Sequence, residues 1–282
     1  MNLDIRAASD YPMADLLYDL NLAFEGYLVP VRFSLQQFQT MLHRDSIDLP
    51  SSRILLANDR PVGIALIARR GWSSRLAAMG IAKEMRGQRA GTWFMEQLIQ
   101  ESLERGEREM TLEVIEQNTA AVRLYKNMGF RIVRRLVGLV HEEKHSQPRV
   151  KLQEIDPREM GQLVMQYGLP DLPWQLSGET VAVLHPPACA YKNENAYIAI
   201  SNPCASDVVI HSLLVEPRAR GKGLALDILT HVMAKHPGRK WHVPAICPEE
   251  FGGMFERAGF QREAISQWQM RLNHLETGPA NS

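Results

Sequence analysis

One segment of the sequence occurs twice, and this repeat constrains the fold more than any other feature. Residues Met79–Gly91 and Leu213–Ala225 each follow an apolar run, contain an Arg-Gly loop and precede a helical pattern. Farther along, each copy has a second helical pattern that ends in a Gly-Phe pair, at Gly129-Phe130 and at Gly259-Phe260. Because the copies lie roughly 130 residues apart, which is the length of a whole domain, the sequence predicts two similar domains in tandem.

The boundary between the copies is predicted in the polar stretch His141–Pro148. This places a first domain at residues 1–140, a linker at 141–149 and a second domain at 150–282. The chain has 282 residues and is 45% apolar, which is enough for two buried cores.

The hydrophobic pattern of the first copy predicts alternating strands and helices. Helices are expected at residues 13–24, after the N-cap Ser34, at 94–103 and at 119–128, where Asn118 is the N-cap. Strands are expected at 3–7, 53–57, 62–68, 76–82, 109–115 and 131–137. Because the helices are few, the predicted fold class is α/β with a mixed sheet of the α+β kind.

Charge and composition exclude several classes of partner. The 32 basic and 32 acidic residues give no net charge, so no positive field favours nucleic acid or an anionic membrane. The basic cluster Arg131, Arg134 and Arg135 fits the solvent face of a strand. With no secretory signal, no membrane-spanning run and three cysteines in no paired spacing, we expect a cytoplasmic protein with reduced thiols.

The repeated Arg-Gly loop has the chemistry of a diphosphate cradle. Small residues allow close approach of a ligand to the backbone, and the N-terminus of the following helix presents free N–H groups and a positive dipole end. A structural turn before a helix is the alternative interpretation, and it is weaker for two copies in matching context.

A strand followed by Arg/Gln-x-x-Gly-x-Gly/Ala and a helix resembles the acetyl-CoA pyrophosphate motif of the GNAT superfamily of N-acetyltransferases. The segment Leu112–Phe130 is similar to the second motif of that superfamily, above all in ribosomal-protein alanine N-acetyltransferases. The resemblance covers roughly residues 3–138 and 150–272, and it implies two tandem GNAT acyl-CoA N-acyltransferase domains with acetyl-CoA as cofactor. It also implies a V-shaped gap between two parallel strands for the pantetheine arm. The cofactor residues implied for the first copy are Ile81, Arg86, Gly87, Gln88, Arg89, Ala90, Gly91, Thr92 and Asn118.

Three residues are candidates for the chemistry of the first copy. Asn118 and Tyr125 are seven residues apart on one helix, so both side chains lie on the same face. The resemblance implies Tyr125 as the general acid for the departing thiolate, Asn118 as a contact of the cofactor arm and Glu113 as the group that draws off the amine proton. The structural alternatives are a packed aromatic for Tyr125, a helix N-cap for Asn118 and an exposed strand residue for Glu113.

The second copy has lost this set. Counting back from Gly259-Phe260 places Phe255 at the position of Tyr125, Pro248 at that of Asn118 and Val243 at that of Glu113. A phenyl ring cannot donate a proton, so the first copy is predicted to be catalytic and the second non-catalytic. The second loop nevertheless keeps Gly223 where the first has Arg89. A second cofactor site is therefore predicted at Val215, Arg220, Gly221, Lys222, Gly223 and Ala225.

Two histidine features are predicted to be structural. His141 and His145 satisfy the spacing of a zinc-protease motif, but the stretch is charged and is followed by Pro148 within one turn. We therefore expect no metal site. His211, on the strand before the second loop, lies near a predicted pocket and is expected to be a satisfied sheet histidine.

The predicted function is N-acetyl transfer from acetyl-CoA to a primary amine, in a small molecule or a peptide N-terminus, by direct transfer in a ternary complex. The segment Phe24–Phe33 is expected to form the acceptor wall. Two alternatives stay open: a non-catalytic acyl-CoA-binding protein, and a mycothiol-synthase-like acyltransferase, which has two GNAT domains but carries the tyrosine motif in its C-terminal half. The protein is expected to be a monomer or a homodimer.

Overall fold

The structure, a computed structural model, describes residues 2–29, 32–142 and 152–277 and divides into two compact units. Unit 1 comprises residues 1–133 together with 269–282, and unit 2 comprises residues 134–268. This division differs from the predicted domains 1–140 and 150–282. Of the predicted linker, His141 and Glu142 belong to a strand of unit 2, and residues 143–149 lie outside the described residues.

The difference arises from the last strand of each copy. Strand β6 (Arg131–Glu142) closes the first copy in sequence, but from Arg134 onward it belongs to unit 2. Strand β12 (Gln261–Asn273) closes the second copy, but its residues from Gln269 onward belong to unit 1. Each compact unit is therefore completed by a strand segment from the other half of the sequence.

The sheet of unit 1 has the order β1-β2-β3-β4-β5 followed by the end of β12. Strands β1 to β4 are joined in antiparallel pairs, and β4 and β5 are parallel. The mixed sheet predicted from the sequence is confirmed. The strands are β1 (Leu3–Ala7), β2 (Arg53–Ala57), β3 (Arg60–Arg70), β4 (Ser73–Ile81) and β5 (Glu109–Ile115).

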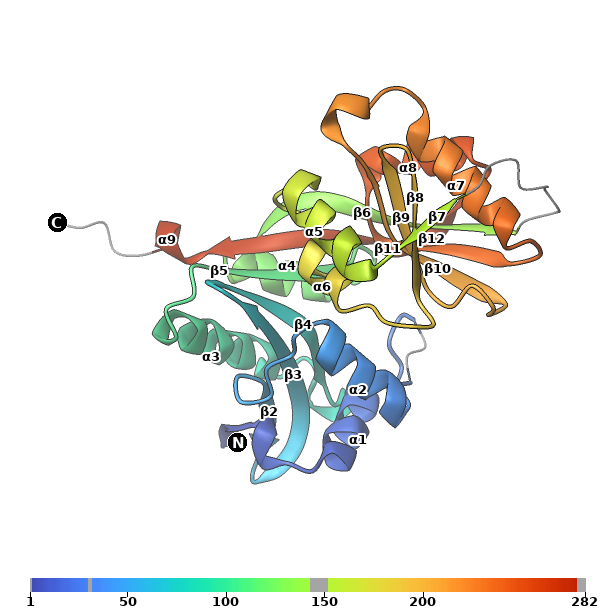
Figure 1. The fold of residues 1–282 in the computed structure, drawn as a ribbon. Helices are drawn as coiled ribbons and strands as arrows, with labels where there is room; N and C mark the ends of the chain where they lie inside the picture. Colours follow the sequence, from blue (N-terminus) through green and yellow to red (C-terminus); the bar gives the residue numbers. More distant parts are fainter. Residues whose placement is uncertain (1, 30–31, 143–151, 278–282) are drawn as a thin grey trace. The chain divides into compact units, whose positions relative to one another are not determined.

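Helices cover both faces of this sheet, with α1 and α2 on one side and α3 on the other (Figure 1). The α1–α2 side has a core in which Leu16, Leu20 and Phe38 pack against Ile54 and Ile64. The predicted N-cap Ser34 is confirmed, because its hydroxyl accepts from the Gln37 amide at 3.2 Å, and together with the Gln37 side chain it forms a capping box. The helices of unit 1 are α1 (Met13–Ala23), α2 (Leu35–Arg44), α3 (Ala90–Glu104), α4 (Thr119–Asn127) and α9 (His274–Thr277), with 3-10 turns η1 (Ala8–Asp10) and η2 (Lys83–Met85).

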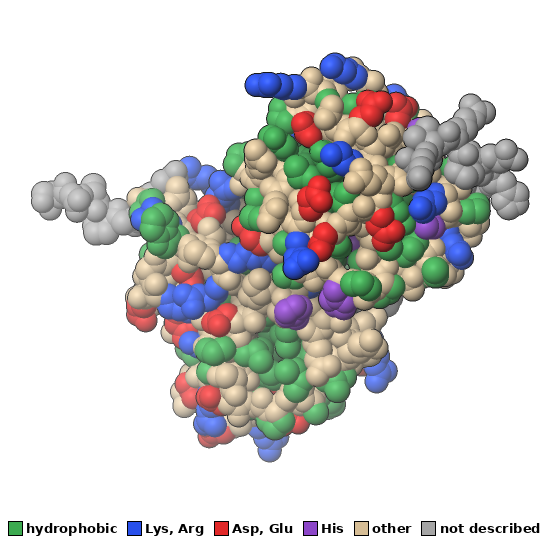
Figure 2. Space-filling view, viewed as in Figure 1, with side chains coloured by type: hydrophobic (Ala, Val, Ile, Leu, Met, Phe, Trp, Pro, Cys, Tyr) green, Lys and Arg blue, Asp and Glu red, His purple; other side chains and the backbone are tan. Residues whose placement is uncertain are grey.

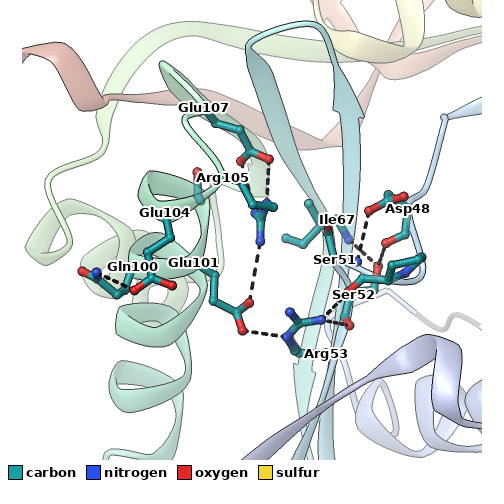
Figure 3. Close-up of polar contacts among 12 residues, drawn as sticks. Asp48, Ser51, Ser52, Arg53, Ile67, Gln100, Glu101, Glu104, Arg105 and Glu107 are labelled. Atoms are coloured by element: carbon teal, nitrogen blue, oxygen red, sulfur yellow. Dashed lines mark hydrogen bonds and ion pairs between the residues drawn. The ribbon is translucent and has the colours of Figure 1, made fainter.

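Ion pairs fix α3 to the sheet. The Arg53 guanidinium on β2 lies 2.8 Å from Glu101 on α3, and Arg105 at the end of that helix lies 2.8 Å from Glu107 (Figure 3). Glu107 is held in its charged form by these contacts. Burial raises the pKa of its carboxyl, but the hydrogen bonds that it accepts outweigh burial and lower the pKa to about 2. The orientation of α3, and hence of its N-terminus, is thereby set by charged contacts as well as by apolar packing.

Unit 2 repeats this arrangement with shorter early elements. Its sheet has the order β12-β6-β11-β10-β9-β8-β7, with β10 and β11 parallel. Trp241, Ile228 and Val232 lie in its core with no exposed surface. The remaining elements are β7 (Gln153–Ile155), α5 (Pro157–Tyr167), η3 (Trp174–Leu176), α6 (Gly178–Ala182), β8 (Cys189–Asn193), β9 (Ala196–Ile200), β10 (Asp207–Val215), η4 (Pro217–Ala219), α7 (Leu224–Lys235), β11 (Lys240–Pro248) and α8 (Glu249–Arg257).

The surface charges are mixed, but Arg134 of the basic cluster expected on a solvent face is only 14% exposed. On the face drawn in Figure 2, basic and acidic side chains are interspersed, and Arg134 and Arg135 pair with Glu250 and Glu249, each at 2.9 Å. All three cysteines lie in the described part of the chain and none forms a disulfide. Among the helices of residues 2–29, 32–142 and 152–277, none has the length and apolar character to cross a membrane.

The return of β12 into unit 1 is secured by a buried histidine. The His274 Nε2 lies 2.8 Å from the Ser102 hydroxyl of α3, and the His274 amide donates to the Arg108 carbonyl. Burial lowers the pKa of His274 below its ordinary value of 6.5. The neutral ring is thus the form that the fold accommodates.

We predict that the free energy of unfolding falls as pH drops below about 6.5, because the unfolded chain then binds a proton that folded His274 resists. His274→Gln should flatten this dependence by at most about 1.4 kcal/mol per pH unit, the limit for one proton. Urea denaturation at pH 8 and pH 5.5 measures the effect, with His185→Gln at an exposed position as the matched control. A pH dependence unaltered by His274→Gln would show that another group carries it.

Candidate functional site

The parallel strands β4 and β5 pair over only part of their length. Their ladder ends with Leu76 opposite Leu112, whereas β4 continues to Ile81 and β5 to Ile115. Strand β4 also has a bulge at Ala77 in its pairing with β3. A bulge bends the strand and re-aims its backbone groups. Beyond the ladder the strands are free to accept a ligand between them, as the predicted V-shaped gap requires.

The loop after β4 turns through two left-handed residues. Gly87 has φ +78° and Arg89 has φ +62°, and Arg89 is the N-cap of α3. No side chain caps this helix, so the amides of its first turn, Ala90–Thr92, lack an intrahelical partner. Left-handed backbone at a non-glycine residue costs about 1 kcal/mol. The Arg89 side chain is exposed, so it extends into solvent at the edge of this group of N–H donors.

Arg86 fixes this loop through backbone carbonyls. Its Nε donates to the Ile81 carbonyl at 2.9 Å, and its Nη2 donates to the Ala23 and Glu25 carbonyls at 3.0 and 3.3 Å. Ala23 is the last residue of α1, so a cation lies at the negative end of that helix dipole. Arg86 therefore joins the end of β4, the end of α1 and the loop, while Gln88 anchors the loop to the Glu84 carbonyl at 2.7 Å.

Tyr125, Asn118 and Tyr27 gather at the open ends of the strands. The Asn118 side chain caps α4 by accepting from the Ala121 amide at 3.2 Å, and its Nδ2 donates to the Tyr27 hydroxyl at 3.4 Å. Tyr125 is 8% exposed and packs edge-on against Phe130. Burial, with a smaller contribution from Tyr27, raises the pKa of the Tyr125 phenol above its ordinary value. The predicted N-cap is confirmed, and the phenol is held in its protonated form.

Glu113 lies in a buried ion pair. The Arg75 Nε donates to its Oε2 at 2.7 Å, and both side chains are almost fully shielded, with 6% and 3% exposed. Arg75 also lies 3.8 Å from Asp45. The Glu113 carboxylate is therefore already engaged by a guanidinium and shielded from solvent. The exposed strand position considered from the sequence is not observed.

Unit 2 reproduces the geometry around its own loop. The ladder of β10 and β11 ends with Val209 opposite His242, and β10 has a bulge at His211. Arg220 donates from Nε to the Val215 carbonyl at 3.1 Å and from Nη2 to the Tyr167 carbonyl, the end of α5, at 2.6 Å. These contacts match two of the three that Arg86 makes, those with the Ile81 and Ala23 carbonyls. Gly221 and Gly223 take the left-handed positions, with φ +78° and +84°.

A cavity of about 590 Å³ lies within unit 2 at the open ends of β10 and β11. The second loop and the N-terminus of α7 form one end, and α8 and the segment after α5 form the walls. Most of its lining is aliphatic or aromatic. Of the second set of predicted cofactor residues, the cavity is lined by Val215, Arg220, Gly221, Gly223 and Ala225, while Lys222 is exposed.

The strand register corrects one alignment between the copies. Asp207 opposite Lys240 corresponds to Ser73 opposite Glu109, so four residues later Pro244, rather than Val243, takes the position of Glu113. Phe255 packs edge-on against Phe260 at 5.5 Å between ring centroids, as Tyr125 does against Phe130 at 5.9 Å. Pro248 is the N-cap of α8, as Asn118 is of α4. Proline supplies neither the side-chain cap nor the amide donor.

Two residues of the first site, Tyr27 and Arg75, were not singled out from the sequence, and neither was Asp19 elsewhere in unit 1. Tyr27 lies within the predicted acceptor wall, but its bond to Asn118 depends on the path of a loop. Arg75 and Glu113 are thirty-eight positions apart, and a parallel register is needed to join them. Asp19, on α1, has a pKa raised to about 6 by burial and by Asp15. Asp15 and Asp19 are four residues apart on one helix, and this like-charge pair can be recognised from the sequence.

The histidine spacing does not form a metalloprotease helix. His141 and Glu142 lie on strand β6, and the His141 ring stacks on Phe260 with its Nδ1 3.0 Å from the Gly259 carbonyl. His145 lies outside the described residues. Within residues 2–29, 32–142 and 152–277, no cluster of three or more metal-ligating side chains occurs.

Comparison with known proteins identifies the fold. Residues 15–130 match the model of the Acetyltransferase (GNAT) family. No curated protein sequence matches the chain. A GCN5-related N-acetyltransferase from Sphaerobacter thermophilus has a similar structure at 16% identity, with a TM-score of 0.65 over 96% of each chain. A tandem GNAT protein from the clavulanic acid biosynthesis pathway is similar at 16% identity, with a TM-score of 0.65 over 99% of this chain and 100% of its own. The predicted tandem GNAT fold is confirmed.

The ion pair of Arg75 and Glu113 yields a stability prediction. Arg75→Met should lower the free energy of unfolding by about 3 kcal/mol, because it leaves a buried carboxylate without its cation. Arg75→Met combined with Glu113→Leu should restore most of that loss, since an apolar pair of similar volume needs no charge compensation. Urea denaturation of the single and double variants measures the difference. Equal losses in the two would contradict a structural ion pair.

Proposed function

We propose that this chain, in which residues 15–130 match the model of the GNAT family, is an N-acetyltransferase that uses unit 1 to transfer acetyl from acetyl-CoA to a primary amine. One observation carries the proposal: a buried, protonated Tyr125 phenol lies on the helix that follows the open end of β5, beside Asn118. Thiolate departure requires a proton donor at such a place.

The reaction proposed is direct attack within a ternary complex. The neutral amine attacks the thioester carbonyl, the carbon–sulfur bond of the tetrahedral intermediate breaks, and the coenzyme A thiolate takes its proton from Tyr125. The amine loses one proton in the same sequence, so the products are an amide and the free thiol. Backbone N–H groups of β4 near Ile81 would stabilise the oxyanion, because the bulge at Ala77 turns the strand away from its ladder.

Acetyl-CoA would be held mainly by backbone groups. We propose that the amides of Gly87 to Thr92 bind the pyrophosphate, in line with the uncapped N-terminus of α3 and the left-handed turn before it. Arg86 would shape the loop through its carbonyl contacts rather than touch phosphate. The exposed Arg89 would add a cation at the rim, where it complements the charge of the cofactor.

Deprotonation of the amine is the least constrained step. Glu113 has two candidate roles, as a base that is released from Arg75 and as a structural partner that stays bound to it. The pH profile of Glu113→Gln separates these roles, because loss of a base removes the acidic limb of the profile, and loss of a structural contact lowers activity without moving it.

The acceptor wall is proposed at Phe24–Phe33, of which residues 30 and 31 lie outside the described residues. Asn21 fixes the far end of this segment through two hydrogen bonds with Phe33, at 2.8 and 3.0 Å. Tyr27 faces Asn118, so an incoming pantetheine arm competes for that amide. The phenyl and phenol groups here favour an acceptor with an apolar part next to its amine, as in a peptide N-terminus.

The two alternatives make different use of the chain. A non-catalytic acyl-CoA-binding protein would bind the cofactor and release no free thiol with any amine. A mycothiol-synthase-like enzyme would require a proton donor in the second copy, where Phe255 stands.

We predict that the protein releases coenzyme A from acetyl-CoA with at least one acceptor in a panel of small amines and peptide N-termini. Tyr125→Phe should lower kcat by at least about 10-fold, with little change in the KM for acetyl-CoA, because the lost interaction is a proton transfer in the transition state. Thiol release followed with a colorimetric disulfide reagent measures both constants.

Tyr18→Phe is the matched control, since it removes a phenol that is 68% exposed on α1. In the unaltered protein, ionisation of the Tyr125 phenol should not change the rate of thiol release up to about pH 10, because burial keeps the phenol protonated. Undiminished activity of Tyr125→Phe would disprove the proposed acid.

A further inference from the structure

We propose that unit 1 has a self-association surface, at which a second copy of this chain binds about a two-fold axis. The surface consists of five exposed side chains, those of Trp72, Leu103, Glu104, Arg108 and Leu275. It lies at the C-terminal end of α3, whereas the loop proposed to hold the cofactor lies at the N-terminal end of that helix. The inference therefore does not depend on acetyl transfer by unit 1.

Trp72 is held at the tip of the hairpin formed by β3 and β4. Arg70 pairs with Ser73, so the turn has two residues, and the first of them, Gly71, takes the left-handed conformation that such turns favour, with φ +54°. The Trp72 carbonyl accepts from the Arg108 amide at 2.7 Å, and the Arg108 guanidinium lies 3.1 Å from the centroid of the indole ring. The indole is nevertheless 62% exposed. A large apolar side chain that is fixed before binding loses little conformational entropy when a partner covers it.

Backbone hydrogen bonds bring the other exposed apolar side chains to the same place. The Arg108 carbonyl accepts from the His274 amide at 2.9 Å, which fixes the start of α9 near the start of β5 (Figure 1). The next residue, Leu275, is 72% exposed. Leu103 is 40% exposed and lies in the last turn of α3, just before the loop to Arg108. Isolated exposed apolar side chains are common, but a cluster around one tryptophan and one arginine is typical of a binding surface.

The charges of the surface identify the partner as a second copy of the chain. Within residues 2–29, 32–142 and 152–277, Arg108 lies on the indole and pairs with no carboxylate, and Glu104 accepts from Gln100 and pairs with no cation. An acidic partner would be repelled by Glu104, and a basic partner would be repelled by Arg108. Two copies related by a two-fold axis place Arg108 of one subunit opposite Glu104 of the partner subunit, and the reverse. Every charge is then paired, and the apolar side chains of the two copies cover one another.

This contact leaves the proposed cofactor site of unit 1 open. Helix α3 has 15 residues, so its two ends lie about 22 Å apart. Arg89 and the amides of the first turn are at one end, and Leu103 and Glu104 are at the other. A partner bound at the C-terminal end therefore does not cover the loop, and each subunit of the dimer keeps its own site.

Sedimentation equilibrium of the full-length protein over about a 100-fold range of concentration tests the proposal. The mass should rise toward twice the 31.9 kDa of one chain. Trp72→Ala should weaken the dimer at least about 30-fold, because a central tryptophan contributes much of the binding free energy and a two-fold contact loses it twice. Tyr18→Ala serves as the control, since it removes an aromatic side chain that is 68% exposed on α1, and it should leave the dimer intact. The mass of one chain at every concentration, or a dimer unaffected by Trp72→Ala, would overturn the proposal.

Charge reversal distinguishes a two-fold contact from any other contact. Glu104→Arg gives each subunit two cations at the surface, and Arg108→Glu gives each subunit two anions, so either variant alone should be largely monomeric. An equimolar mixture of the two variants should dimerise, because the cations of one then face the anions of the other. A mixture that stays monomeric refutes the two-fold pairing.

Oxidative footprinting of the unaltered protein needs no variant to fold. Hydroxyl radicals should label Trp72 and Leu275 less at high protein concentration than at low, because the partner covers them, whereas Tyr18 should be labelled equally at both. Equal labelling of Trp72 at both concentrations, in a sample of dimeric mass, would place the contact elsewhere and disprove the proposal.

Discussion

Incomplete pairing of the two parallel strands is the constraint on which each unit depends. A parallel ladder satisfies backbone groups evenly along both strands, so ending it early leaves polar groups that need other partners. In unit 1 the ladder ends at Leu76, and in unit 2 it ends at Val209. The bulge that follows each ladder turns the longer strand away from its neighbour. The open strand ends are where the proposed cofactor would make the contacts that the sheet does not make.

The arginine of each loop donates hydrogen bonds to the backbone carbonyl at the end of the separated strand. Arg86 and Arg220 each occupy the last carbonyl of the strand and the last carbonyl of the first long helix of their unit. A lysine could not reach both with directed donors, since its ammonium is a single point charge. The motif arginine is thus explained by the architecture of the loop, and the proposed phosphate contacts are left to the backbone. Because the backbone and the motif arginine together form the loop, Arg89 can take the position of a glycine in one copy without altering the turn.

Much of this structure could be predicted from local sequence. The two Arg-Gly loops, the caps Ser34 and Asn118 and the mixed sheet follow from short-range patterns, and all are observed. The exchange of final strands between units could not be predicted in this way, because β6 and β12 have equivalent patterns and either unit offers a free edge. The pair of Arg75 and Glu113 likewise depends on the register of two strands separated by a helix. The alignment of Pro244 with Glu113 depends on a one-residue difference that counting from the Gly-Phe pair does not detect.

The two copies place different side chains at equivalent positions of one fold. In the first copy the buried Tyr125 lies on the same helix as Asn118, whose amide donates to the Tyr27 hydroxyl. Replacement of that phenol by Phe255 and of the asparagine by Pro248 removes the need for polar partners, so the same region can be lined by leucines and remain open. The proton donation proposed for Tyr125 and a wide apolar chamber are competing uses of the same helix face. Duplication of the domain allows one chain to have both a polar and an apolar version of that face.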